Sequence, residues 1–132
     1  MDASVVVKHL LAEPDSALAD RFLEQHPGTL AAPDLLQVEV ANVLCHAKHL
    51  PSGRAREEGL ERFFALGIAL EPPQPEDVQQ ALRLALSSGL TAYDATYVAM
   101  ARKHGVRLVT ADAKLVAKTR SDDVVLLRDW RP

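Results

Sequence analysis

The feature that most constrains the fold is an alternation of helical segments with very short, wholly apolar ones. Helical periodicity, with capping and helix-breaking residues at the ends, predicts helices over residues 15–26, 34–49, 52–66, 75–88, 91–104 and 112–118. The apolar segments between them predict strands over residues 29–32, 68–70, 107–110 and 124–127. Strands that lack polar alternation are buried on both faces. The pattern therefore predicts an α/β fold in which helices cover both faces of a parallel sheet.

Length and composition agree with a single globular domain over residues 1–132. Apolar residues make up 48% of the chain and charged residues 25%, which is the usual balance of a folded protein. No apolar run approaches the roughly 18 residues needed to cross a bilayer, so we expect no membrane association. Residues 1–4 lack the basic region of a signal peptide. A single cysteine, Cys45, forms no internal disulfide, which favours a cytoplasmic location.

The net charge of -3 argues, taken alone, against a protein that binds nucleic acid over its whole surface. The charge is unevenly distributed, however, because eight of the 15 basic residues lie after residue 101. Two interpretations stay open: a solvated C-terminal surface, or a local basic face on an acidic protein.

Four acidic residues occupy unusual positions. Asp94 lies in the first turn of a predicted helix, and Asp112 directly follows a predicted strand. Both positions face the carboxyl end of the sheet, where ligands of α/β proteins bind. Glu39 lies inside an apolar helix, where a carboxylate is costly unless it is paired or bound to metal. Asp2 precedes the apolar run 5–7. Taken singly, each acid has an ordinary explanation as a helix cap, a solvated terminus or a side chain that reaches water.

Four segments that contain these acids together resemble the motifs of PIN-domain nucleases, most closely the VapC-type toxins of toxin–antitoxin pairs. They are residues 2–8 (DASVVVK), 39–44 (EVANVL), 90–101 (LTAYDATYVAMA) and 108–112 (LVTAD). The third segment is the most specific, because it combines an acid with Asp-Ala-x-Tyr spacing. The resemblance covers nearly the whole chain. It implies a PIN-like three-layer α/β/α domain with a central, mostly parallel sheet of about five short strands.

The same resemblance implies the site. Its metal-binding, catalytic acids fall on Asp2, Glu39, Asp94 and Asp112, and its supporting polar positions fall on Ser4, Asn42 and Thr110. Four carboxylates held close together repel one another, and a divalent cation relieves that repulsion. An all-oxygen ligand set suits Mg²⁺ or Mn²⁺, as one or two ions. We therefore expect a metal-dependent endoribonuclease that hydrolyses RNA with an activated water.

Basic residues near these motifs are candidates for guiding the RNA backbone: Lys8, Arg102, Lys114 and Lys118. One feature departs from the family pattern, in which a central strand precedes the first acid. Here only Met1 precedes Asp2. Either the natural start lies upstream, or the chain builds its first strand from very few residues. The resemblance implies that the segment after Asp2 is helical, although the valines at 5–7 favour a strand by propensity.

The toxin resemblance also implies a small antitoxin as partner and a homodimer. Apolar side chains on predicted helices need burial, either at such an interface or in the core of a single chain: Val5, Val6, Leu10, Leu11, Leu60, Phe63 and Phe64. Two alternatives keep the fold, namely a catalytically silent PIN-like module that binds RNA or protein, and a housekeeping nuclease of RNA maturation. Cys45 is expected to be a buried or half-buried apolar group. His46 and His49 are expected on the surface.

Overall fold

The computed structural model describes residues 1–131 and contains seven α-helices, four short strands and one 3-10 helix in that range. The elements are α1 (Ala3–Leu10), α2 (Ser16–Glu24), β1 (Ala31–Pro33), α3 (Leu35–His46), α4 (Gly53–Ala65), β2 (Ala69–Glu71), α5 (Pro75–Ser88), α6 (Ala92–Lys103), β3 (Leu108–Thr110), α7 (Ala113–Thr119), β4 (Val124–Leu126) and η1 (Leu127–Asp129). Every helix and strand predicted from periodicity is present. Pro132 lies outside the described residues.

Side-chain caps explain where several helices begin. Ser52 and Thr91 accept hydrogen bonds from the backbone N–H groups of Ala55 and Asp94, at the starts of α4 and α6. Asp2 caps α1 in the same way, so the valines at 5–7 are helical, as the family resemblance implied. Burial of Val5 and Val6 in the core outweighs their β propensity.

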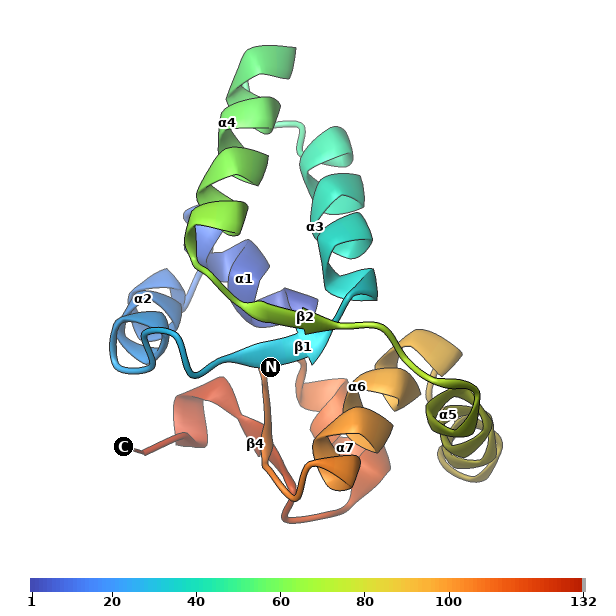
Figure 1. The fold of residues 1–132 in the computed structure, drawn as a ribbon. Helices are drawn as coiled ribbons and strands as arrows, with labels where there is room; N and C mark the ends of the chain where they lie inside the picture. Colours follow the sequence, from blue (N-terminus) through green and yellow to red (C-terminus); the bar gives the residue numbers. More distant parts are fainter. Residues whose placement is uncertain (132) are drawn as a thin grey trace.

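Helix α3 ends at His46, three residues before the predicted end. The cause lies in the neighbouring helix, because Arg56 of α4 donates to the carbonyl oxygens of Leu44 (3.1 Å) and Ala47 (3.2 Å). These bonds satisfy carbonyls that a continuing helix would have used. Helices α3 and α4 lie side by side as an arm that projects from the β1–β2 pair (Figure 1).

The strands form two parallel pairs, β1 with β2 and β3 with β4. Met1 and Asp2 lie between the pairs: the Met1 amino nitrogen donates to Ala31 O and the Asp2 N–H donates to Val109 O, each over 3.3 Å. Figure 1 shows the amino terminus beside β1. The expected sheet of about five strands is thus four strands in the described residues, with two residues standing where a central strand would run.

Helices cover both faces of these strands, as predicted. Helix α1 contacts β3 from one side and packs against α2, α3 and α4, while α6 contacts β1 and β3 and packs against α5. One cluster of buried apolar side chains fills the space between the layers. Most of the apolar residues that were expected to need burial find it within this core, because Val5, Val6, Leu10, Leu11 and Phe63 are all buried.

One expectation about a helix surface is wrong. Cys45 is exposed, because it lies on the outward side of α3 one position beyond the buried Leu44. The apolar side chains of α5 do not form one buried face, because Val78, Leu82 and Leu86 are 54%, 55% and 80% exposed. Only Ala81 of this group is fully buried. No helix among residues 1–131 has the length and apolarity to cross a membrane.

Candidate functional site

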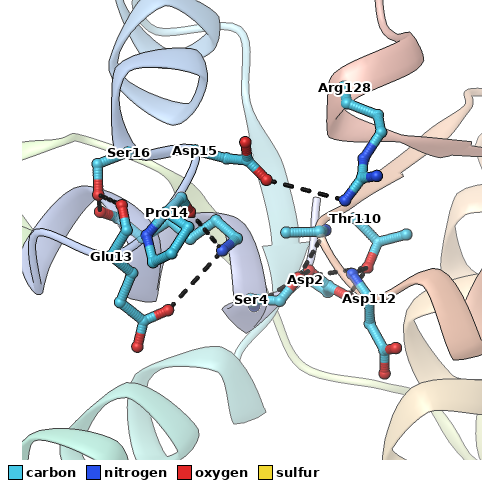
Figure 2. A network of polar contacts seen from close by, with 11 residues as sticks. Asp2, Ser4, Glu13, Pro14, Asp15, Ser16, Thr110, Asp112 and Arg128 are labelled. Atoms are coloured by element: carbon cyan, nitrogen blue, oxygen red, sulfur yellow. Dashed lines mark hydrogen bonds and ion pairs between the residues drawn. The ribbon is translucent and has the colours of Figure 1, made fainter.

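Asp2 is the centre of the candidate site. One of its carboxylate oxygens accepts from the backbone N–H (3.1 Å) and the hydroxyl (2.6 Å) of Ser4, and the other accepts from the Thr110 hydroxyl (2.5 Å). The side chain is buried, and burial raises the pKa of Asp2 above its usual range, while the bonds from Ser4 and Thr110 act to lower it. Figure 2 shows Asp2, Ser4 and Thr110 turned toward one another.

The two hydroxyls also shape the turn that carries Asp112. Ser4 Oγ accepts from the backbone N–H of Ala111 (2.7 Å), and Thr110 Oγ1 accepts from that of Asp112 (3.0 Å). Asp112 then caps α7 by accepting from the Lys114 N–H (2.7 Å). The start of α1 and the end of β3 are therefore held together at a fixed separation, with an acid on each.

Asp94 and Glu39 come from two further helices. Asp94, in the first turn of α6, accepts from the Thr91 hydroxyl over 2.8 Å. Glu39 of α3 is half-buried and accepts a hydrogen bond from the hydroxyl of Tyr97, one turn after Asp94 on α6. Burial raises the pKa of Glu39, and the negative charges of Asp2 and Asp94 raise it further. Glu39 thus shares one region of negative potential with these two acids.

The donor set suits a hydrated divalent cation. No three histidine, cysteine, aspartate or glutamate side chains among residues 1–131 surround a common point closely enough to hold an ion directly. Mg²⁺ usually keeps several of its waters and takes only one or two carboxylates from the protein. Four oxygen-donating acids, with no histidine or cysteine bonded to them, fit that mode of binding and not a zinc site.

The supporting and basic residues divide into two groups. Asn42 is exposed one turn after Glu39, and Lys114 is exposed beside Asp112. The Lys118 ammonium, one turn further along α7, donates to Gly89 O over 2.7 Å, near the start of α6. These three residues lie on the elements that carry the acids.

The other two basic candidates point elsewhere. Lys8 donates to Pro14 O over 2.6 Å and lies 3.8 Å from Glu13, so it is tied to the loop between α1 and α2. Arg102 pairs with Asp123 over 2.5 Å. It lies eight residues from Asp94 on α6, about 12 Å along the helix axis. Neither contacts the acids of the candidate site.

Tyr97 is a site residue whose role the sequence did not reveal. Its ring is buried, with 3% of the residue's surface exposed. Its hydroxyl nevertheless reaches Glu39, 58 positions earlier in the chain. The one sequence signal for this contact is the three-residue spacing from Asp94, which places both side chains on one face of α6.

Comparison with known proteins agrees with this fold. Residues 1–120 match the family model described as the PIN domain. The chain therefore belongs to the PIN-domain family, which confirms the resemblance drawn from the four acidic segments.

Two relatives, both from Pyrobaculum aerophilum, are VapC proteins. The chain is 37% identical over 123 residues to "Ribonuclease VapC3", covering 89% of this chain and 92% of that protein. It is 36% identical over 105 residues to "Exonuclease VapC9", covering 76% and 74%. The crystal structure of PAE2754 from the same organism superposes with a TM-score of 0.72 at 27% identity, covering 96% of this chain and 88% of that one.

Proposed function

We propose that the protein is a metal-dependent endoribonuclease and the toxin of a VapBC-type pair. The observation that carries the proposal is that the negative charges of Asp2 and Asp94 act on Glu39, while Ser4 and Thr110 join Asp2 to the turn that carries Asp112. A fold gains no stability from placing like charges together, so a ligand of opposite charge accounts for the arrangement.

The residues around the acids have defined tasks in this proposal. Ser4 and Thr110 fix both oxygens of Asp2, and Tyr97 holds Glu39 in position. Asp94 and Asp112 sit at helix starts and each keep one carboxylate oxygen for a ligand. Lys114 and Lys118 offer positive charge to the RNA backbone on the same side. Bound Mg²⁺ or Mn²⁺, as one or two ions, supplies a water of lowered pKa and positive charge for the phosphate.

A cleavage assay with matched variants tests the proposed activity. We expect the protein to cut RNA in Mn²⁺ and to lose the activity in EDTA. Loss of a residue that only hydrogen-bonds to a metal ligand typically lowers activity about 10–100-fold. Asp94→Asn removes a proposed ligand itself, so the cleavage rate should fall by more than this. Asp122→Asn, at an exposed acid distant in the chain from the four motifs, is the control and should cleave normally. Full cleavage by Asp94→Asn, or in EDTA, would contradict the proposal.

A circular RNA substrate decides between internal and terminal cleavage. The names of the two VapC relatives leave the mode of cleavage open, because one is called a ribonuclease and the other an exonuclease. A circular RNA has no ends, so only an endonuclease converts it to a linear product. We expect that product; degradation confined to the linear form of the same RNA would show an exonuclease.

The exposed stripe on α5 supports the homodimer in the proposal. Val78, Leu82 and Leu86 follow one another at four-residue spacing and lie outward, with Tyr93 of α6 also 66% exposed. Contiguous apolar surface of this kind marks protein interfaces. Sedimentation at micromolar concentration should show a dimer that Leu82→Glu converts to a monomer, whereas Gln79→Glu on α5 should leave it intact.

Growth experiments separate a toxin from the two alternatives. Induction of the wild-type chain should arrest growth, and co-expression of the small protein encoded beside it should restore growth. A housekeeping nuclease would cleave RNA without that rescue. A silent RNA- or protein-binding module would bind no Mn²⁺ in calorimetric titration, so that the wild type and Asp112→Asn would give the same flat trace.

A further inference from the structure

We propose that Tyr93 stacks on an RNA base beside the cleaved phosphodiester, so that the substrate must be single-stranded at that point. This role rests on the proposed nuclease activity, and it specifies the form of RNA that the site accepts. Tyr93 directly precedes Asp94, one of the four acids, and its side chain is exposed.

Tyr93 is the most exposed aromatic residue among residues 1–131. The chain has one tryptophan, two tyrosines and three phenylalanines. Those that pack in or against the core are Phe22, Phe63, Tyr97 and Trp130. Tyr93 is 66% exposed and Phe64 is 53% exposed, and no second ring in the described part of the chain packs on Tyr93. A single exposed ring is ordinary on a protein surface, so its surroundings decide whether it binds a ligand.

The position of Tyr93 on α6 places it beside the acids. Tyr93 and Asp94 both lie in the first turn of this helix. Tyr97 follows four residues after Tyr93, and residues at this spacing share one face of a helix. Because the Tyr97 hydroxyl donates to Glu39, that face is directed toward α3. Tyr93 thus lies one turn nearer the helix start, on the side of α6 that meets Glu39.

An unpaired RNA base fits this position. Proteins recognise single-stranded RNA largely by stacking its splayed bases on aromatic rings. In the proposed reaction the acids hold, through a divalent ion, the phosphate that is cut. The base next to that phosphate then lies within reach of a ring one residue away from Asp94. A base inside a duplex is already stacked and paired, so it would have to leave the helix before it met Tyr93.

The homodimer proposed for the α5 stripe is a competing use of Tyr93. The stripe of Val78, Leu82 and Leu86 repeats every four residues along α5, whereas Tyr93 belongs to α6 and adjoins an acid. An interface requires apolar area alone, whereas stacking requires the flat face of an aromatic ring. Tyr93→Leu separates the two uses, because leucine keeps an apolar side chain and lacks that face.

Cleavage kinetics in Mn²⁺ on an unstructured single-stranded RNA test the stacking role. We expect Tyr93→Leu to raise KM about 5–150-fold with kcat nearly unchanged, since a stacked base contributes about that factor to the binding of single-stranded RNA. Tyr93→Phe keeps the ring and should match the wild type. Phe64→Leu removes the other exposed ring from α4, which carries none of the four acids. This control should leave KM unchanged.

Two further measurements exclude other causes of a raised KM. Sedimentation of Tyr93→Leu should match that of the wild type, and a raised KM together with a dissociated dimer would place Tyr93 in the interface and overturn the proposal. The wild type should cut the same RNA far more slowly after the RNA is annealed to its complement. Equal cleavage of the single strand and the duplex would also overturn the proposal.

The stacking role and the nuclease activity fail in different ways. If the wild type cuts the single strand and Tyr93→Leu has the same KM, the activity stands and the stacking role is wrong. If the wild type cuts no RNA, both are wrong.

Discussion

The hydroxyl of Thr110 donates to a carboxylate oxygen of Asp2 that is buried away from water. Thr110→Val keeps the shape of the side chain and removes that donor. The charged form of Asp2 is then less well satisfied, so the pKa of Asp2 should rise further. We expect the free energy of unfolding at neutral pH to fall by about 1–3 kcal/mol, measured by urea denaturation. Thr110→Ser keeps the hydroxyl, and an equal loss of stability in Thr110→Ser would rule out this cause.

Tyr97 is a positioning residue for Glu39 in the proposed metal site. Tyr97→Phe removes the hydroxyl and leaves the buried ring, so packing in the core is retained. We expect Mn²⁺ affinity in calorimetry to fall about 10–100-fold, as for other outer partners of metal ligands. The pH at which Mn²⁺ binding is half-maximal should also rise, because Glu39 loses a bond that lowers its pKa. A variant that binds Mn²⁺ normally over the whole pH range would show that the tyrosine is purely structural.

Residue-level predictions succeeded where the signal is local. Thr91 lies three residues before Asp94 and caps α6, as this spacing predicts. Asp112 follows a strand directly and caps α7. The pairing of Tyr97 with Glu39 joins two helices, and no local rule relates positions 58 residues apart. Likewise, Lys8 was an RNA candidate because it lies in the first acidic segment, six residues after Asp2, but its partners are Glu13 and Pro14 in the loop between α1 and α2.

Lys103 links three elements, namely β2, α5 and α6. Its ammonium lies 3.0 Å from Glu71 of β2 and 3.0 Å from Asp77 of α5, while the residue itself ends α6. The hydrogen bond from Lys103 lowers the pKa of Glu71, and that of Asp77 is lowered first by the Gln74 N–H and then by Lys103. The pKa of Lys103 is raised by both acids.

The direction of these pKa shifts fixes the pH dependence. Acids with lowered pKa values stabilise the fold above their ordinary pKa of about 4, and this stabilisation is lost as the pH falls through the lowered values. Lys103→Met should therefore reduce the free energy of unfolding at pH 7, and the difference from wild type should shrink as the pH falls below about 4. Lys114→Met, which removes an exposed lysine with no ion pair in residues 1–131, is the control. A constant difference across this pH range would show that the lysine acts through packing.

Element boundaries were less predictable than the elements themselves. The end of α3 depends on Arg56, which belongs to another helix, so the periodicity of α3 alone placed its end too late. The outward faces of α3 and α5 carry Cys45 and Leu82, and apolar spacing alone does not show which of two adjacent faces meets the core. Sequence periodicity thus located six of the seven helices in the described residues, and α1 was implied only by the family resemblance. It misjudged the burial of side chains where an apolar stripe is wider than the surface that contacts the core.

For the whole molecule, the alternation of helices with short apolar strands was enough to predict the α/β layers. The described residues form two parallel pairs of strands, and Met1 and Asp2 lie between them with one hydrogen bond to each pair. The net charge, which taken alone argues against nucleic-acid binding, has a different explanation when the candidate site is considered. Four of the 18 acids belong to the candidate metal site, so the charge of -3 describes an acidic site and not a uniformly acidic surface.

In the proposed metal site, binding of the ion would be linked to the stability of the entire fold. They belong to or cap α1, α3, α6 and α7, which are far apart in the chain and meet only when it is folded. An ion that binds this folded arrangement and not the unfolded chain adds about 2.7 kcal/mol at a concentration 100 times its Kd. Urea denaturation in increasing Mn²⁺ should therefore show the unfolding midpoint rising and its slope unchanged. Asp94→Asn and Asp112→Asn should flatten this dependence, whereas Asp122→Asn should retain it. If Mn²⁺ leaves the wild-type midpoint unmoved, the acids do not form a metal site in the folded protein.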